Sequence, residues 1–252
     1  MKPPLPELSD AERGRYARHL ALPELGATGQ ARLKRARVLL VGVGGLGSAS
    51  SLYLAAAGIG RLGLAEFDTV DDSNLQRQVL YDTWQLGRPK LDAARERLQA
   101  LNPHIEVAGH PGRLTPANAP ALVGDYDVVV DGTDNLPARH LINDTCLRGG
   151  KPYVYASVCC FVGEVSDFAC AGGPCYRCLY PAPPAASPAA PAPGLLGVLP
   201  GVIGVIQATE TIKLLLGIGQ PLVGRVLRYD ALAMTFRILR LARDPDCPAC
   251  GR

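Results

Sequence analysis

An apolar run that leads into clustered glycines constrains the fold of this chain more than any other feature. Residues 36–43 read ARVLLVGV, and Gly42, Gly44 and Gly47 follow the spacing G-x-G-x-x-G. The apolar run is typical of a buried strand, and the alanine-rich residues 46–57 are typical of a helix. Glycines in such a turn let the backbone approach a phosphate, which the free N–H groups of the helix N-terminus attract. The pattern therefore predicts a Rossmann-like nucleotide site.

Predicted strands and helices alternate along the first half of the chain. We expect strands at 36–43, 61–68, 105–110, 126–135 and 151–157, with helices at 46–57, 86–103 and 136–148. Such alternation indicates a mainly parallel sheet with helices on both faces. A helical segment at about 8–35 precedes it, and Ser9 and Glu12 have the spacing of a capping box at its start.

The second half of the chain has a different pattern. Residues 161–173 and 223–241 each favour a hairpin, so we expect antiparallel strands to extend the sheet in the C-terminal half. A buried helix is predicted at 203–216. Residues 181–194 are rich in proline and alanine, which is typical of an extended, mobile loop. Because a buried helix follows this loop, we expect a single domain over 1–252.

Composition excludes several classes of protein. The net charge of +3 and the absence of a long basic run argue against nucleic acid as a partner. The N-terminus lacks the apolar core of a signal peptide. The most apolar segment, 195–206, is shorter than the roughly 20 residues that a membrane span needs. We therefore expect no membrane association and a cytoplasmic location.

Eight cysteines in a reducing compartment favour metal binding over disulfides. Cys175-x-x-Cys178 and Cys247-x-x-Cys250 form two pairs whose four thiolates suit a closed, structural zinc site. The alternative is a redox pair or unpaired core thiols. The other cysteines, which are Cys146, Cys159, Cys160 and Cys170, are expected to be buried small residues.

Polar residues after the glycines help to decide which nucleotide the site binds. Glu66 ends the second predicted strand, where an acidic residue holds ribose hydroxyls. Arg77 and Lys90 follow, with Asn74 nearby, and Asp134 ends the fourth strand as a candidate metal ligand. Chemistry at phosphorus needs cations and a metal ion around the transferring group, whereas hydride transfer does not. These residues therefore favour ATP over NAD.

Five segments together resemble one family. VGVGGLG, with its extra Gly45, EFDTVDDSNLQRQ, GRPK, DGTDN and CYRC are similar to segments of the MoeB/ThiF/HesA adenylyltransferases, bacterial relatives of ubiquitin-activating enzymes. The resemblance extends from 15 to 251. It implies a homodimer that binds ATP and Mg²⁺ and adenylates a small ubiquitin-like carrier protein ending in Gly-Gly. The carrier's C-terminal carboxylate attacks the α-phosphate, giving an acyl-adenylate and pyrophosphate.

The resemblance also implies roles for single residues. Glu66 holds the ribose, although the family usually has Asp there and Asp68 is an alternative. Asp134 organises magnesium, and Arg18 reaches the ATP of the other subunit. The four paired cysteines hold zinc. The full set of ATP-binding residues is Gly42, Gly44, Gly45, Gly47, Glu66, Asp68, Asn74, Arg77, Lys90, Asp134 and Asn135.

The sequence leaves the pathway open. The resemblance leans towards MoeB, which implies a MoaD-type carrier and molybdopterin synthesis; a ThiS-type carrier of thiamin thiazole synthesis is the alternative. An NAD-dependent oxidoreductase and a non-catalytic scaffold are more distant alternatives. No cysteine lies between Cys178 and Cys247, so we expect no persistent covalent adduct with the carrier through the loop at 181–194. We also expect a separate protein to donate sulfur.

Overall fold

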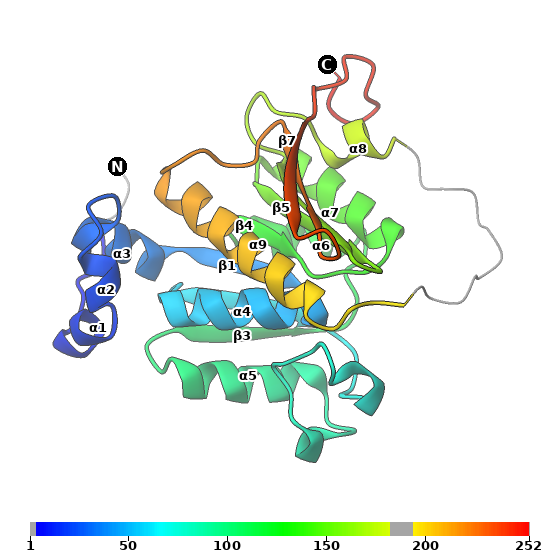
Figure 1. Ribbon diagram of the computed structural model, residues 1–252. Helices are drawn as coiled ribbons and strands as arrows, with labels where there is room; N and C mark the ends of the chain where they lie inside the picture. The colour runs from blue at the N-terminus through cyan, green and yellow to red at the C-terminus, as the bar shows by residue number, and fades with distance from the viewer. Residues whose placement is uncertain (1–3, 182–193, 252) are drawn as a thin grey trace.

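The strand predicted at 36–43 forms β1 (Arg37–Val41), which lies inside an eight-stranded sheet. The computed structural model describes residues 4–181 and 194–251. The strand order is β3-β2-β1-β4-β5-β6-β7-β8 (Figure 1). Strands β1 to β5 pair in parallel, and β6, β7 and β8 add antiparallel pairs at one edge. This arrangement confirms the predicted fold class.

The helices lie on both faces of the sheet, as predicted. The remaining strands are β2 (Arg61–Glu66), β3 (Glu106–Pro111), β4 (Val128–Asp131), β5 (Tyr153–Cys159), β6 (Val162–Phe168), β7 (Arg225–Asp230) and β8 (Thr235–Arg240). The helices are α1 (Asp10–Arg15), α2 (Ala17–Leu20), α3 (Gly26–Arg35), α4 (Gly45–Ala57), α5 (Lys90–Leu101), α6 (Ala119–Gly124), α7 (Leu136–Gly149), α8 (Tyr176–Leu179) and α9 (Leu199–Leu216), with 3₁₀ turns at Asp72–Asn74 and Thr83–Gln85. Helices α4, α5 and α9 cover one face, and α6 and α7 cover the other (Figure 1).

Each face has its own apolar core. Leu54 of α4, Leu98 of α5 and Ala208 of α9 pack against one face of the central strands. On the other face, Ile142 of α7 packs with a cluster of buried aromatic rings that includes Tyr153 and Phe168. At the N-terminus, Ser9 and Glu12 form the predicted capping box. The core therefore holds the carboxyl ends of β1, β2 and β4 at a fixed edge of the sheet.

Helix α5 begins at Lys90 and not at residue 86, as the sequence pattern indicated. The N–H of Gly87 donates to the carbonyl of Val70, and the N–H of Lys90 donates to the carbonyl of Asp68. Pro89 has an extended backbone, with ψ of 127°. These contacts join residues 86–89 to the end of the β2 segment, so Lys90 lies at the first turn of α5 beside the end of β2.

The prediction of a hairpin within residues 161–173 was wrong. Only one strand forms there, β6, and it pairs antiparallel with the preceding strand β5. The hairpin at 223–241 is confirmed as β7 and β8. The proline- and alanine-rich loop predicted at 181–194 lies, for residues 182–193, outside the described part of the chain.

Helix α9 begins earlier than the predicted residue 203. Pro200 lies in its first turn, which tolerates proline because the N–H groups there have no partner within the helix. By length and composition it is apolar enough to cross a membrane, but half of it is buried inside the protein. Gly204 lets it approach α4, since a Cβ there would lie 2.5 Å from the carbonyl oxygen of Leu46. Helix α9 is thus part of the core beside the glycine-rich turn.

Candidate active site

A cavity of about 980 Å³ lies at the carboxyl ends of β1, β2 and β4. In an open α/β sheet, ligands bind at this edge. Two of the predicted site residues, Gly47 and Arg18, do not line the cavity. The predicted residues that line it are Gly42, Gly44, Gly45, Glu66, Asp68, Asn74, Arg77, Lys90, Asp134 and Asn135.

The glycine-rich turn connects β1 to α4, and its glycines allow backbone conformations and close contacts that a side chain would prevent. Gly42 has a φ of +84°, a left-handed conformation that glycine adopts readily. A Cβ at Gly47 would lie 2.2 Å from the carbonyl oxygen of Gly42, so Gly47 permits close packing of α4 on the turn. This position explains why Gly47 is needed although it does not face the cavity.

Glu66 is buried and holds the glycine-rich turn in place. One carboxylate oxygen accepts the N–H of Val43 at 2.9 Å, and the other accepts the N–H groups of Phe67 at 2.8 Å and Asp68 at 3.0 Å. Tyr81 also donates its hydroxyl to the carbonyl of Val43 at 2.9 Å. Most of the accepting capacity of the Glu66 carboxylate is therefore used by the backbone.

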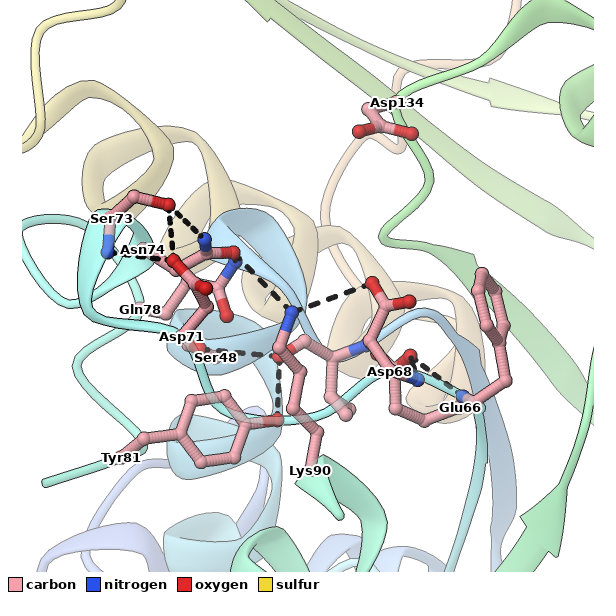
Figure 2. Close-up of polar contacts among 12 residues, drawn as sticks. Ser48, Glu66, Asp68, Asp71, Ser73, Asn74, Gln78, Tyr81, Lys90 and Asp134 are labelled. Carbon is pink, nitrogen blue, oxygen red and sulfur yellow. Dashed lines mark hydrogen bonds and ion pairs between the residues drawn. The ribbon is translucent and has the colours of Figure 1, made fainter. Parts of the chain in front are cut away.

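Lys90 brings a buried ammonium group to the cavity wall. Its side chain is 5% exposed, and Nζ lies 3.5 Å from Oδ2 of Asp68 and 3.4 Å from Oδ1 of Asn74. Gln78 also donates to this Asn74 oxygen, at 2.7 Å. Figure 2 shows Lys90 between Asp68 and Asn74. The distances to both oxygens are long, so the ammonium group can still donate to a ligand in the cavity.

Arg77 and Asp134 come to the cavity from different elements. Arg77 donates to the carbonyl of Ser73 at 3.1 Å, in the segment between β2 and α5. Asp134 follows β4, is exposed, and lies across the cavity from Lys90 in Figure 2. Its neighbour Asn135 caps α7 by accepting the N–H of Ala138 at 3.0 Å. The site thus has cations on one wall and a carboxylate on another.

A buried hydrogen-bond network beside the turn that carries Asp134 was not predicted from the sequence. Asp131, at the end of β4, accepts the hydroxyl of Tyr153 and both the N–H and the hydroxyl of Thr133. Burial raises the pKa of Asp131, while Arg139 at 3.8 Å opposes that rise. Arg139 also lines the cavity and donates to the carbonyl of Thr133 at 3.1 Å. The network holds the turn that carries Asp134.

A contact between a cationic and an aromatic side chain in the cavity wall was also not predicted from the sequence. Arg113, which follows β3, lies 3.8 Å from the centre of the Phe67 ring, and both residues line the cavity. This is a cation–π contact. Phe67 lies between the two acidic residues at the end of β2, so the stacked pair lies next to the predicted ribose site. The only available signal was its position at the end of a strand.

Arg18 lies on α2, among the N-terminal helices (Figure 1). It is exposed and is absent from the lining of the cavity. Its neighbour His19 contacts Gln30 through Nδ1 at 3.0 Å. Within one subunit, Arg18 is therefore not part of the cavity wall.

The four paired cysteines converge, as predicted. Their sulfur atoms all lie within 4.8 Å of one another, and Sγ of Cys175 lies 3.6 Å from Sγ of Cys247. Sγ of Cys178 lies 3.4 Å from Sγ of Cys250. A zinc ion with Zn–S bonds of about 2.3 Å places its sulfurs roughly 3.8 Å apart, so the thiols fit this ion. Zinc bound there would join α8 to the C-terminal residues.

The expectation for the other cysteines was partly wrong. Cys146 is buried and Cys170 is half-buried, but Cys159 and Cys160 are exposed. Cys159 is the last residue of β5, and Cys160 begins the tight turn to β6, where both residues are exposed. Cys159 also lines the cavity.

Comparisons with known proteins match nearly the whole chain. The family model described as "ThiF family" matches residues 16–249. The chain is 50% identical to a sulfur carrier protein adenylyltransferase of Thermus thermophilus over 247 residues, covering 95% of this chain and 91% of that protein. It is 48% identical over 252 residues to the bovine adenylyltransferase and sulfurtransferase MOCS3, covering 99% of this chain but 55% of that protein.

Solved structures support the fold. The chain matches a crystal structure of Escherichia coli MccB with MccA-N7isoASN at a TM-score of 0.84, with 22% identity and coverage of 97% of this chain and 76% of that chain. The MccB structure with ATP gives a TM-score of 0.82 at 23% identity, with coverage of 98% and 77%. Relatives of this identity show that the chain is an adenylyltransferase enzyme. It belongs to the ThiF family.

Proposed function

We propose that this enzyme adenylates the C-terminal carboxylate of a small sulfur-carrier protein that ends in Gly-Gly. The carboxylate attacks the α-phosphate of ATP, an acyl-adenylate forms and pyrophosphate leaves. The observation that carries this proposal is a single cavity that joins a glycine-rich turn to two cationic residues, Arg77 and Lys90, with Asp134 opposite them. The relatives named as sulfur-carrier or MOCS3 adenylyltransferases support the choice of substrate.

The cations in the cavity suit the charge of this reaction. A carboxylate that approaches a triphosphate is repelled, and Arg77 and Lys90 reduce that repulsion by binding phosphate oxygens. Lys90 is nearly buried, which strengthens its interaction with an anion relative to water. A carboxylate is already ionised at neutral pH, so the attack needs no general base. Much of the remaining rate would come from holding the two reactants side by side.

Asp134 is the residue that would hold magnesium. Mg²⁺ is usually held by one or two carboxylates, with substrate phosphates and water completing its ligands. In the described residues, the only group of three or more close His, Cys, Asp or Glu ligand atoms is the cysteine quartet. Asp134 therefore suits an ion that arrives with the nucleotide. When bound, this ion would neutralise part of the phosphate charge.

The end of β2 would hold the nucleoside. Asp68 is exposed and borders the cavity, whereas the carboxylate of Glu66 is occupied by backbone N–H groups. We therefore assign the ribose hydroxyls to Asp68, with Glu66 positioning the turn. The Arg113–Phe67 pair lies beside them and offers a flat surface on which the base can stack.

An exposed apolar surface lies next to the cavity and would bind the carrier. It consists of Phe161, Leu232, Met234 and Phe236, which are 40%, 73%, 72% and 55% exposed. The carbonyl of Phe161 accepts the N–H of Ala231, so the two turns are joined. Phe161 is two residues from Cys159, which lines the cavity. A carrier seated here could extend its flexible C-terminus towards the phosphates.

Leu232→Asp tests this surface. A charge at the centre of an apolar contact should raise the KM for the carrier about tenfold or more, because hot-spot residues carry most of the binding energy. Binding of ATP should not change. Trp84→Ser, which alters another exposed apolar side chain (69% exposed) away from the hairpin, is the matched control. An unchanged carrier KM in the Leu232 variant would contradict the assignment.

Carrier-dependent exchange of labelled pyrophosphate into ATP tests the function itself. The wild-type enzyme should exchange label only when a Gly-Gly carrier is present. Lys90→Ala and Arg77→Ala should each reduce exchange by about 100-fold or more, as losses of oxyanion-stabilising groups do. Lys151→Ala is the control, since Lys151 contacts the carbonyl of Gly124 and does not line the cavity. Exchange without a carrier, or full exchange in the Lys90 variant, would contradict the proposal.

The pathway is proposed to be molybdopterin synthesis, on the resemblance of the sequence to MoeB. The ThiS-type carrier of thiamin thiazole synthesis is the second candidate. Exchange assays with a MoaD-type and a ThiS-type carrier, at equal concentrations, compare the two directly. A higher kcat/KM for the ThiS-type carrier would overturn the molybdopterin assignment.

A further inference from the structure

The turn between β5 and β6 contains two adjacent cysteines in an unusual conformation. Cys159 pairs with Val162, so Cys160 and Phe161 form a two-residue hairpin turn. Cys160 has a φ of +52°. Asn, Asp and Gly are the residues that favour positive φ in such turns, whereas Cys has no conformational preference for it. A non-glycine residue held in this region motivates a functional hypothesis, which here rests on the geometry of the two thiols.

The two thiols are close together and accessible. Their sulfur atoms lie 3.5 Å apart, and both residues are exposed. The hydrogen bond with Cys160 raises the pKa of Cys159, which agrees with a proton held between the two sulfurs. Neither residue belongs to the cysteine quartet that fits zinc. The pair is therefore a second, separate group of thiols.

The same turn fixes the start of the segment that leads into α9. The N–H of Cys160 donates to the carbonyl of Gly194 at 3.1 Å, and the N–H of Leu196 donates to the carbonyl of Cys160 at 3.0 Å. Cys159, Gly194 and Leu195 all line the cavity. A change in the geometry of the turn would therefore move one wall of the cavity.

We propose that Cys159 and Cys160 are a vicinal dithiol modification site, which a peroxide oxidises to a disulfide and thereby reshapes this wall. One thiol loses its proton and attacks a peroxide oxygen; the O–O bond breaks, a sulfenic acid forms, and the leaving hydroxide takes up that proton as water. The neighbouring thiol then displaces the sulfenic oxygen as a second water, and the S–S bond forms. Two electrons leave the sulfurs and reduce one hydrogen peroxide. The effect on catalysis rests on the proposed adenylation function, but the modification does not.

Closing the bond shortens the sulfur separation from 3.5 Å to about 2 Å. The turn must adjust its backbone to allow this. Because the backbone of Cys160 makes both hydrogen bonds to residues 194 and 196, the adjustment is passed to the cavity wall. We therefore expect oxidation to lower carrier-dependent pyrophosphate exchange, and dithiothreitol to restore it.

Peptide mass measurement on the zinc-loaded enzyme tests the site. After brief treatment with hydrogen peroxide and blocking of free thiols, cleavage after Arg148 and Glu164 gives residues 149–164, which contain only these two cysteines. This peptide should escape blocking and be lighter by about 2 Da than its reduced form, since two thiol hydrogens are lost. Cys160→Ser should prevent disulfide formation, keep its exchange activity before treatment and lose the reversible inhibition. Cys170→Ser should behave as wild type.

Recovery of the peptide with both thiols blocked, or with only sulfinic acid, would overturn the site. Equal reversible inhibition of the Cys160 variant would overturn its link to the cavity wall. Absence of exchange in the untreated enzyme would instead contradict the proposed function, because the peptide masses do not depend on turnover.

Discussion

Glu66 and Asp68 are two residues apart, but their carboxylates have different surroundings. Glu66 is buried and accepts three backbone N–H groups, whereas Asp68 is exposed and contacts only Lys90 at 3.5 Å among the ion pairs of the described residues. A carboxylate already saturated by the backbone stabilises the turn, and an open one can accept ribose hydroxyls. We therefore propose that Glu66 positions the turn and that Asp68 accepts the ribose hydroxyls.

This division can be tested with 2′-deoxy-ATP. The wild-type enzyme should prefer ATP, because a hydroxyl that pairs with Asp68 is missing from the analogue. In Asp68→Ala, the ratio of ATP affinity to 2′-deoxy-ATP affinity should fall by about 10-fold. This is the change expected when one hydrogen bond to a charged group is lost. Glu66→Gln should weaken the binding of both nucleotides alike, because it perturbs the turn. If the Glu66 variant alone lost the preference, Glu66 would be the ribose ligand.

Helix α9 and strand β6 meet at a pair of buried acids. Asp167 and Glu210 both accept the N–H of Leu222, at 2.7 Å and 2.9 Å, and Lys213 pairs with Glu210. Burial, with the adjacent Glu210 carboxyl, raises the pKa of Asp167 from 3.8 to about 8. The folded protein therefore keeps a proton on this pair at pH values where the unfolded chain releases it.

The stability of the fold should therefore decrease as pH rises between about 4 and about 8. Because the folded pKa is above the unfolded value, this contribution is complete below pH 4 and is lost as pH approaches 8, by an amount on the order of several kcal/mol. In Asp167→Asn, the urea concentration at the unfolding midpoint should change less with pH across this range. Asp92→Asn, on the exposed side of α5, should keep the wild-type slope. A wild-type slope in the Asp167 variant would contradict this origin.

The cysteine quartet links α8 to the end of the chain across a sequence separation of 72 residues between Cys178 and Cys250. With zinc bound, four thiolates would stabilise this junction, since structural zinc contributes directly to folding free energy. Cys250→Ser should reduce the zinc content from about one ion per chain and lower the melting temperature. Cys170→Ser is the matched thiol-to-hydroxyl control. Wild-type zinc content in the Cys250 variant would contradict the assignment.

We propose, from the family resemblance, that the protein acts as a dimer; Arg18 does not line the cavity of the single chain. It can contact phosphates only if a second copy places it there, as the resemblance implies. Arg18→Ala and Arg77→Ala should each reduce exchange by about 100-fold or more. Mixing the two variants and allowing subunits to exchange should restore about a quarter of wild-type activity, since half of the dimers are mixed and each has one intact site. No recovery, when isotope labelling of one variant and native mass measurement verify that subunits have exchanged, would contradict action across the dimer.

Local patterns were sufficient for much of the sheet. The run of apolar residues at β1, the glycines after it and the helix α4 follow from short-range rules of periodicity and turn chemistry. The same rules failed at 86–89, where Gly87 donates to the carbonyl of Val70 and Arg88 accepts the N–H of Val70, in place of the first turn of a helix. They also failed at 161–173, because a strand's partner is a long-range choice that its own residues do not specify.

The sequence by itself determined the glycine-rich turn, the cysteine quartet and most of the residues around the cavity, because strand ends of a parallel sheet meet at one edge. Only the tertiary structure decided which of those residues are buried and which groups they contact. It separated Glu66 from Asp68, paired Arg113 with Phe67 and exposed Cys159 and Cys160. Those outcomes depend on burial and on contacts between elements distant in sequence. Such contacts form only when the chain has folded.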